Sequence, residues 1–263
     1  MLKKRWEIKA NAKAAMKEQW GTSILTLIIM NLVIFAGSIF WYIPILGILL
    51  VYATVIFIDS PLMIHAEGVF IKVYRRQETD AGELFSAFSI NYWRKVGGTL
   101  WMNLWIFIWC IPVGIVWGAF VFGMVTLSLS EGTVILAIVI IIALAIVPIV
   151  KYFAYSMAPF ILADCPGVTA TEALKLSIRM TNGHKWKLFV MFLSFIGWYI
   201  LGIFTFGILW LVFVNPYLYS THAGYYVEIR DLAISEGTID AYEFGIENGQ
   251  TIDSSDLFGH EFF

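Results

Sequence analysis

The stretch GHKWKLFVMFLSFIGW (residues 183–198) begins with a small basic cluster, continues as hydrocarbon and ends on a tryptophan. A helix in the core of a soluble protein keeps a polar stripe at 3.6-residue spacing. Between Leu188 and Trp198, however, Ser194 is the only hydrophilic side chain. The stretch therefore predicts a helix that enters a lipid bilayer from its basic end.

The composition extends this prediction to the whole chain. Of its 263 residues, 60% are apolar and 14% are charged, whereas soluble domains average about half and about a quarter. We therefore expect an integral membrane protein. The net charge of −2 gives no case for nucleic acid as a partner. Cys110 and Cys165 fit neither a disulfide framework nor a metal-ligand spacing, so we expect free thiols, no metal and no cofactor.

Apolar runs of about 20 residues predict six membrane-spanning helices. They lie at residues 21–42, 45–64, 98–121, 133–152, 186–204 and 207–226. The fourth span has an alternative placement at residues 140–159, because apolar sequence continues through KYFAYSMAPFILA. That choice decides whether Lys151 lies at the interface or inside the membrane. The first run is longer than the apolar region of a signal peptide, about 7–15 residues, so we expect it to be an uncleaved span.

Lysine and arginine are distributed on one side of these spans. All 17 fall in the N-terminal segment, in or beside the connections after the second and fourth spans, or after the sixth span. The other three connections, WYIPI, TLSLSEG and FTFG, contain none. Because cytoplasmic flanks of membrane spans collect basic residues, we expect both termini to be cytoplasmic in a bacterial plasma membrane.

A three-fold repeated organisation accounts for the arrangement of the spans. Each pair of spans follows a short, partly polar segment that closes with Trp20, Trp93 or Trp186. The second span of each pair reaches a proline near its cytoplasmic end, at Pro61, Pro159 and Pro216. The expected fold is all-α, with six transmembrane helices as three hairpins, each preceded by an interfacial amphipathic helix. The units would cover residues 1–77, 78–168 and 169–230.

The third amphipathic segment, TEALKLSIRMTNGHKW, has the clearest two-faced pattern. Its polar face comprises Glu172, Lys175, Arg179 and Asn182, and its apolar face comprises Leu174, Leu176, Ile178 and Met180. Basic and tryptophan side chains of the three segments are candidate contacts with anionic lipid of the cytoplasmic leaflet. These candidates are Lys9, Lys13, Lys17, Trp20, Trp93, Arg94, Lys95, His184, Lys185 and Trp186.

Four residues form a candidate polar site inside the membrane. They are Asp59, Ser60, Asn215 and Lys151. Asp59 is either a proton or substrate ligand that faces a cavity, or a side chain that reaches the headgroups or caps backbone freed by Pro61. Pairing of Asp59 with Lys151 is a further hypothesis. We expect Glu67 to be solvated near the interface and His222 to act as an interfacial anchor.

Residues 183–226 carry a resemblance to a known family. The matching elements are Gly183 to Lys185, LSFIGW, the turn of Thr205 and Gly207, the Pro216–Tyr217 pair and THAGYY. In these elements the chain resembles a family of polytopic membrane proteins of Gram-positive bacteria called domain of unknown function 975. That family is similar in turn to the membrane portion of some glycerophosphodiester phosphodiesterases. The resemblance implies a six-span fold and a plasma membrane location, and it transfers no catalytic residue.

Enzyme signatures are missing from the sequence. It contains no nucleophile elbow, no phosphate-binding glycine loop and no histidine-carboxylate metal motif, so we expect a non-enzymatic protein. One hypothesis is a protein that handles lipid or another amphipathic substrate through a cavity open to the cytoplasm. The other is an accessory or scaffold protein for envelope stress or peptide immunity, without a transport path.

The C-terminal segment differs in composition from the rest of the chain. Residues 231–263 carry eight acidic side chains and no lysine or arginine. We expect a disordered cytoplasmic tail. It would be either a solubilising extension or a docking peptide for a basic protein partner.

Overall fold

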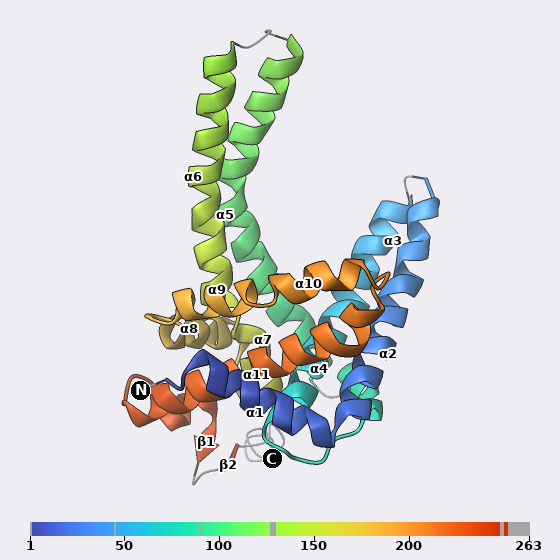
Figure 1. Ribbon diagram of the computed structural model, residues 1–263, viewed down its shortest axis with the longest axis vertical. Helices are drawn as coiled ribbons and strands as arrows, with labels where there is room; N and C mark the ends of the chain where they lie inside the picture. Colours follow the sequence, from blue (N-terminus) through green and yellow to red (C-terminus); the bar gives the residue numbers. More distant parts are fainter. Residues whose placement is uncertain (1, 45, 90, 127–129, 248–249, 252–263) are drawn as a thin grey trace, which may run out of the picture.

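The computed structural model describes residues 2–44, 46–89, 91–126, 130–247 and 250–251, and it is almost entirely helical (Figure 1). The α-helices are α1 (Arg5–Glu18), α2 (Trp20–Ser38), α3 (Leu46–Thr54), α4 (Ser60–Tyr74), α5 (Tyr92–Thr126), α6 (Glu131–Tyr155), α7 (Ala158–Asp164), α8 (Ala170–Met180), α9 (Lys185–Leu193), α10 (Ile196–Ile203) and α11 (Asn215–Ser235). Short 3-10 helices are η1 (Ile39–Tyr42), η3 (Ala81–Phe88) and η5 (Ala241–Phe244), and π-helices are η2 (Val55–Asp59) and η4 (Trp210–Val214). Strands β1 (Ile246–Glu247) and β2 (Gln250–Thr251) form one small antiparallel pair.

Five helical segments of the described chain are long and apolar enough to cross a membrane. They are Trp20–Tyr42, Leu46–Tyr74, Tyr92–Thr126, Glu131–Asp164 and Lys185–Ile203. The structure is therefore consistent with the predicted multi-pass, all-α membrane protein. The expected sixth span at residues 207–226 is not among the five, because the last part of that stretch belongs to α11, which carries many polar side chains.

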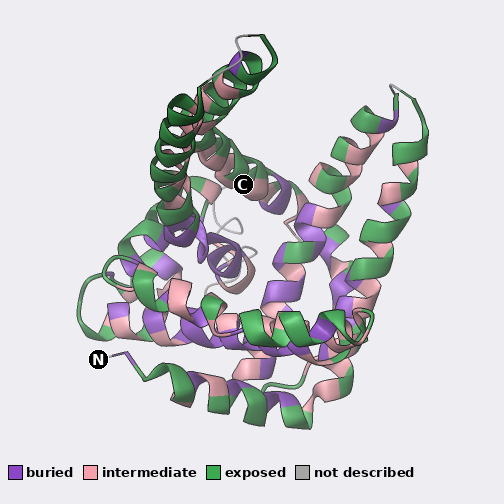
Figure 2. Ribbon diagram, turned by 45° about the horizontal axis from the view of Figure 1, so that its top comes forward, coloured by how far each residue is buried: buried purple, intermediate pink, exposed green. Residues whose placement is uncertain are grey.

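The long antiparallel pair of α5 and α6 projects away from the rest of the protein (Figure 1), and most of its side chains are exposed (Figure 2). Phe107 is 65% exposed, Ile115 66% and Val125 80%. Apolar surface costs about 25 cal/mol per Å² in water, and patches of this extent mark contact with another apolar phase. Lipid around this pair would remove that cost.

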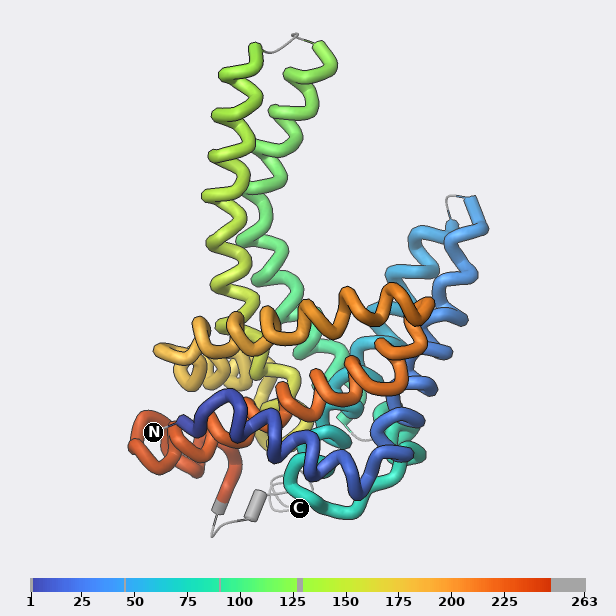
Figure 3. The backbone as a smooth tube through the Cα atoms, viewed as in Figure 1, coloured from blue at the N-terminus to red at the C-terminus, as the bar shows by residue number. Residues whose placement is uncertain are grey.

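The hydrophobic core lies at the base, where α1, α4, α7, α9 and α11 meet. Helices α1 and α11 come from opposite ends of the sequence and run side by side (Figure 3). Helices α4 and α11 approach closely at Gly224, where an added Cβ would lie 2.4 Å from the Cε2 atom of Tyr74. A residue without a side chain therefore permits this contact.

The three prolines of the repeat pattern occupy the same position in the fold. Pro61, Pro159 and Pro216 are each the second residue of the helix that follows a break, in α4, α7 and α11. The π-helices η2 and η4 both end two residues before their proline. Proline lacks an N–H group and frees the carbonyl four residues earlier. At Pro61 that carbonyl, on Phe57, accepts a 2.8 Å hydrogen bond from the Tyr92 hydroxyl.

The polar segments before each pair of spans correspond to α1, η3 and α8. Helix α8 begins with a capping box of Thr169 and Glu172 and buries three apolar residues of its expected face, Leu174, Leu176 and Met180. Ile178, expected on the same face, is 39% exposed. The second segment is shorter than expected, because Asn91 turns the chain at a φ of 49°. Trp93 and its neighbours consequently begin α5.

The acidic segment does not leave the fold at residue 231. Helix α11 continues to Ser235, and Ile239 and Phe244 are buried beyond it. Arg179 of α8 forms an ion pair with Glu243 and donates a 2.8 Å hydrogen bond to the carbonyl of Thr238. The part up to residue 247 is therefore packed, in contrast to the expected free tail. Residues 252–263 lie outside the described residues.

Candidate functional site

A cavity of about 250 Å³ lies among helices from all three of the expected repeat units. Helices α4, α5, α6, α7, α9, α10 and α11 and the turn after α6 each contribute to its wall. The lining residues are Met63, Glu67, Met102, Ile106, Tyr152, Ser156, Pro159, Phe192, Tyr199, Asn215, Leu218, Tyr219 and His222. Met63 and Tyr152 are 39% and 49% exposed, so the cavity reaches the surface at these two residues.

Two titratable side chains of this cavity occupy equivalent positions in the chain. Glu67 lies six residues after Pro61, and His222 lies six residues after Pro216. Glu67 is 3% exposed, and its Oε2 atom has no hydrogen-bond partner among the described residues. The Nε2 atom of His222 also lacks one. Buried polar atoms are nearly always satisfied in folded proteins, so the two unpartnered atoms make this cavity the candidate site.

One part of the cavity wall is held by a hydrogen-bonded set from α10, η4 and α11. The hydroxyl of Tyr199 donates a 2.8 Å hydrogen bond to Oδ1 of Asn215. The indole of Trp210 donates to the carbonyl of Tyr199 at 2.8 Å, and it fills the space beside Gly202. These bonds fix the orientation of both polar groups at the edge of the cavity.

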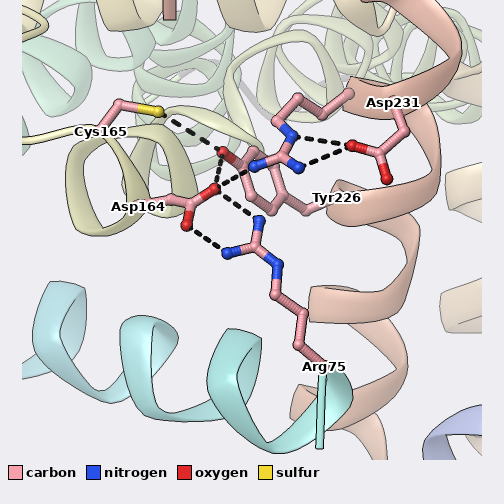
Figure 4. Close-up of polar contacts among 6 residues, drawn as sticks. Arg75, Asp164, Cys165, Tyr226 and Asp231 are labelled. Atoms are coloured by element: carbon pink, nitrogen blue, oxygen red, sulfur yellow. Dashed lines mark hydrogen bonds and ion pairs between the residues drawn. The ribbon is translucent and has the colours of Figure 1, made fainter. Parts of the chain in front are cut away.

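A second polar cluster joins side chains from α7, α11 and the residue after α4 (Figure 4). Asp164 at the end of α7 accepts two hydrogen bonds from Arg75 after α4, at 2.7 and 2.8 Å. It also accepts bonds from Arg230 at 2.6 Å and from the hydroxyl of Tyr226 at 2.9 Å, both on α11. The carboxylate is 8% exposed, so it forms a buried link among the three expected units. We call these four residues the Asp164 cluster.

The surroundings of the Asp164 cluster suppress acid–base and thiol reactivity there. Burial raises the pKa of the neighbouring Cys165 thiol to about 12, so this sulfur is not a thiolate near neutral pH. Burial works to lower the pKa of Arg230, but Tyr226, Asp164 and Asp231 raise it above its ordinary value. The cluster therefore holds fixed charges and acts as a structural clamp.

Aromatic packing connects this cluster to the cavity. Tyr226 stacks on Phe160 with ring centroids 5.4 Å apart, and Phe160 contacts the edge of His222 at 4.7 Å. His222 also packs against Phe192 at 5.1 Å. The imidazole is thereby held between two phenyl rings while it lines the cavity. Its position depends on the clamp through this row of rings.

The structure brings only one of the four expected intramembrane residues to the cavity, which is Asn215. Ser60 donates a 2.9 Å hydrogen bond to the carbonyl of Val55, inside the π-helical break. Lys151 places its ammonium 4.3 Å from the ring centroid of Trp109. Asp59 does not form an ion pair with Lys151, and we therefore drop that pairing.

The ten candidate lipid contacts fall into three groups. Lys13, Lys17, Trp93 and Trp186 are exposed, and the two tryptophans are 73% and 72% accessible. Trp20, His184 and Lys185 are half-buried. Lys9, Arg94 and Lys95 make their contacts inside the protein, so they do not fit a role at the lipid surface.

These three cations, of which Lys95 is buried and Lys9 and Arg94 are half-buried, each have specific partners. Lys9 donates to the Ser194 hydroxyl at 3.2 Å and lies 4.1 Å from the ring centroid of Phe195. Lys95 is 4% exposed, and its ammonium lies 3.2 Å from Nδ1 of His65. Arg94 donates to three backbone carbonyls in the last turn of α7 and the loop that follows it. Their helical-wheel positions resemble those of surface residues, but the neighbouring helices cover them.

Comparison with known proteins places the chain in a family. Residues 1–233 match the family described as "Protein of unknown function (DUF975)". The chain belongs to this family. The resemblance, which is clearest in residues 183–226 and was expected to cover roughly residues 1–230, is thus confirmed. No curated protein and no solved structure matches the chain.

The structure changes the surroundings expected for two residues of this DUF975 chain. Glu67 was expected to be solvated and His222 to be an interfacial anchor, whereas the structure buries Glu67 and directs both to one cavity. The role of Asp164 follows only from its contacts in the structure. The equal spacing of Glu67 and His222 from their prolines is the one sequence signal that could have joined them.

Proposed function

We propose that the protein is a non-enzymatic, multi-pass plasma-membrane protein that binds a lipid or another amphipathic molecule in the cavity around Glu67. The observation that carries the proposal is the lining of that cavity. Met63, Met102, Ile106 and Leu218 offer apolar surface, while Glu67, Asn215 and His222 offer polar groups at the same place. A small number of polar groups in an apolar wall is the usual construction of a ligand site.

The proposal includes a sixth crossing by residues 207–226. Five crossings would place the two termini on opposite sides of the membrane, yet basic residues both precede the first span and follow residue 226. Because lysine and arginine collect on the cytoplasmic side, an even number of crossings accounts for this pattern. Glu67 then lies in the inner half of the bilayer, between Pro61 and the basic residues 72–76. The cavity would open toward the cytoplasmic leaflet.

The first prediction concerns this orientation. In a chain whose Cys110 and Cys165 are replaced by serine, a cysteine at Ser130 should react with an impermeant thiol reagent added to intact cells. A cysteine at Glu78 should react only after permeabilisation. Both positions lie outside the helices that cross the membrane, so access to reagent decides the result. Labelling of position 78 but not 130 in intact cells would reverse the topology.

The second prediction tests the binding function. The full-length protein in nanodiscs is titrated with octyltrimethylammonium, octanol and octyl phosphate, with empty nanodiscs as the blank. At least one probe should bind saturably. Ile106→Trp, which fills part of the cavity, should weaken that binding by about tenfold or more. Ile108→Trp on the same helix is the control, because Ile108 is 41% exposed and does not line the cavity.

Two outcomes would contradict the proposed function. One is the absence of saturable binding for all three probes by a protein that unfolds cooperatively on heating. The other is equal loss of binding in Ile106→Trp and Ile108→Trp. Either result favours the accessory or scaffold hypothesis, in which the helices enclose no binding site.

A further inference from the structure

The cavity contains a carboxyl group without a counter-charge. Glu67 is 3% exposed, and no lysine or arginine is among the described residues that line the cavity with it. Two cations of neighbouring helices have other contacts, since Lys151 lies over Trp109 and Lys95 contacts His65. A carboxylate inside a membrane is costly unless it is paired. A cation bound in the cavity would therefore stabilise the ionised form of Glu67.

Aromatic rings surround the same space. Tyr152, Tyr199, Tyr219 and Phe192 all line the cavity, and they come from four different helices. Tyr219 is held by stacking on Phe70, with ring centroids 5.3 Å apart. Rings attract a cation placed over their faces, and an aromatic cage is the usual means of binding a quaternary ammonium group. An aromatic cage beside an unpaired carboxyl favours a ligand with an alkylated ammonium group, which is positively charged and weakly hydrated.

The apolar part of the wall adds a requirement for the rest of the ligand. Met63, Met102 and Ile106 lie on α4 and α5, and Met63 lies where the cavity reaches the surface. Methionine adapts its shape to varied apolar partners. An alkyl chain attached to the bound head could leave along this side toward the lipid. His222, held between Phe160 and Phe192, presents an imidazole nitrogen to the same space.

From these observations we infer that the cavity is a binding site for an organic cation with an apolar tail, whose ammonium group lies against Glu67 and the tyrosine rings. The inference rests on the proposed function and specifies its ligand class. Neutral and anionic amphiphiles lack the charge that Glu67 requires. The ligand would enter as a cation and pair with the carboxyl group of Glu67. Release of the ligand would leave that carboxyl group unpaired again.

The probe titrations test this inference separately from the function itself. Octyltrimethylammonium should bind the wild-type protein about tenfold more tightly than octanol, and octyl phosphate should bind least. Glu67→Gln keeps the shape of the side chain and removes its charge, so it should abolish the preference for the cation and leave octanol binding unchanged. Glu67→Asp, which keeps the charge, should retain part of the preference.

A second variant covers the case in which Glu67→Gln does not fold. Tyr152→Leu removes one ring at the exposed rim of the cavity and should lower cation affinity several-fold while octanol affinity stays the same. Octanol binding as tight as cation binding in the wild type would overturn the inference but leave the proposed function standing. Loss of binding for every probe in the wild type would instead remove the proposed function.

Discussion

Replacing Asp164 with asparagine should lower the free energy of unfolding by about 3–5 kcal/mol, the effect of removing one partner of a buried ion pair. The change keeps the shape of the side chain but removes the negative charge that Arg75 and Arg230 share. Their side chains are 24% and 13% exposed, so water cannot replace the lost partner fully. Three helices lose their common attachment at once.

The measurement is thermal unfolding of the purified protein, followed by tryptophan fluorescence in one detergent. Asp231→Asn is the matched control, because Asp231 also bonds Arg230 but is 57% exposed. Surface pairs of that kind contribute at most about 1 kcal/mol, so the control should shift the transition far less. Equal shifts for the two variants would show that the Asp164 cluster does not hold α4, α7 and α11 together.

Removing the charges of Asp164 and Arg75 together tests their pairing more directly than either single change. Asp164→Asn combined with Arg75→Met should destabilise the protein less than the sum of the single changes, since a lone buried charge costs more than none. Additive losses in this double-mutant cycle would mean that the two side chains act independently. The cycle also separates a clamp from a mere packing contact.

The helices and the three prolines could be predicted from the sequence for a clear physical reason. An apolar run of sufficient length has few alternatives to a helix in lipid, where every backbone polar group needs an internal partner. Proline acts locally, through the N–H group that it lacks. The breaks before Pro61 and Pro216 therefore follow from the chain itself. Neither inference required knowledge of which helices are neighbours.

The candidate site, in contrast, depended on tertiary contacts. A carboxyl such as Glu67 next to a basic segment carries the same local pattern whether it is solvated or buried. Its burial follows from the packing of α4 against α7 and α11, which no periodicity in residues 60–74 records. The acidic segment shows the same limit, because Phe244 is buried only through contacts made by distant parts of the chain. The position of Lys95 under the 3-10 helix η3 is a further case.

Arg94 provides the last prediction, because its expected role at the lipid surface and its observed contacts lead to opposite results. Its guanidinium donates hydrogen bonds to the carbonyls of Val168 at 2.6 Å and Leu162 at 3.0 Å, and to that of Cys165. The carbonyls at a helix end have no partner within the helix, and each buried one left unsatisfied costs about 1–3 kcal/mol. Arg94→Met should therefore destabilise the protein by about 3 kcal/mol, measured by the same thermal unfolding.

Comparison with two other substitutions decides between the roles of Arg94. Arg94→Lys keeps the charge but cannot reproduce the planar fork of donors, so it should still lose much of the stability, whereas a headgroup contact would tolerate lysine. Arg76→Met is the control, because Arg76 is 56% exposed and lies 3.7 Å from Glu18, and it should shift stability by no more than about 0.5 kcal/mol. An Arg94→Met protein with normal stability but weaker retention of anionic lipid would restore the lipid role. The expected loss of stability instead places Arg94 with Asp164, as a charge that joins α5 and α7 from inside the protein.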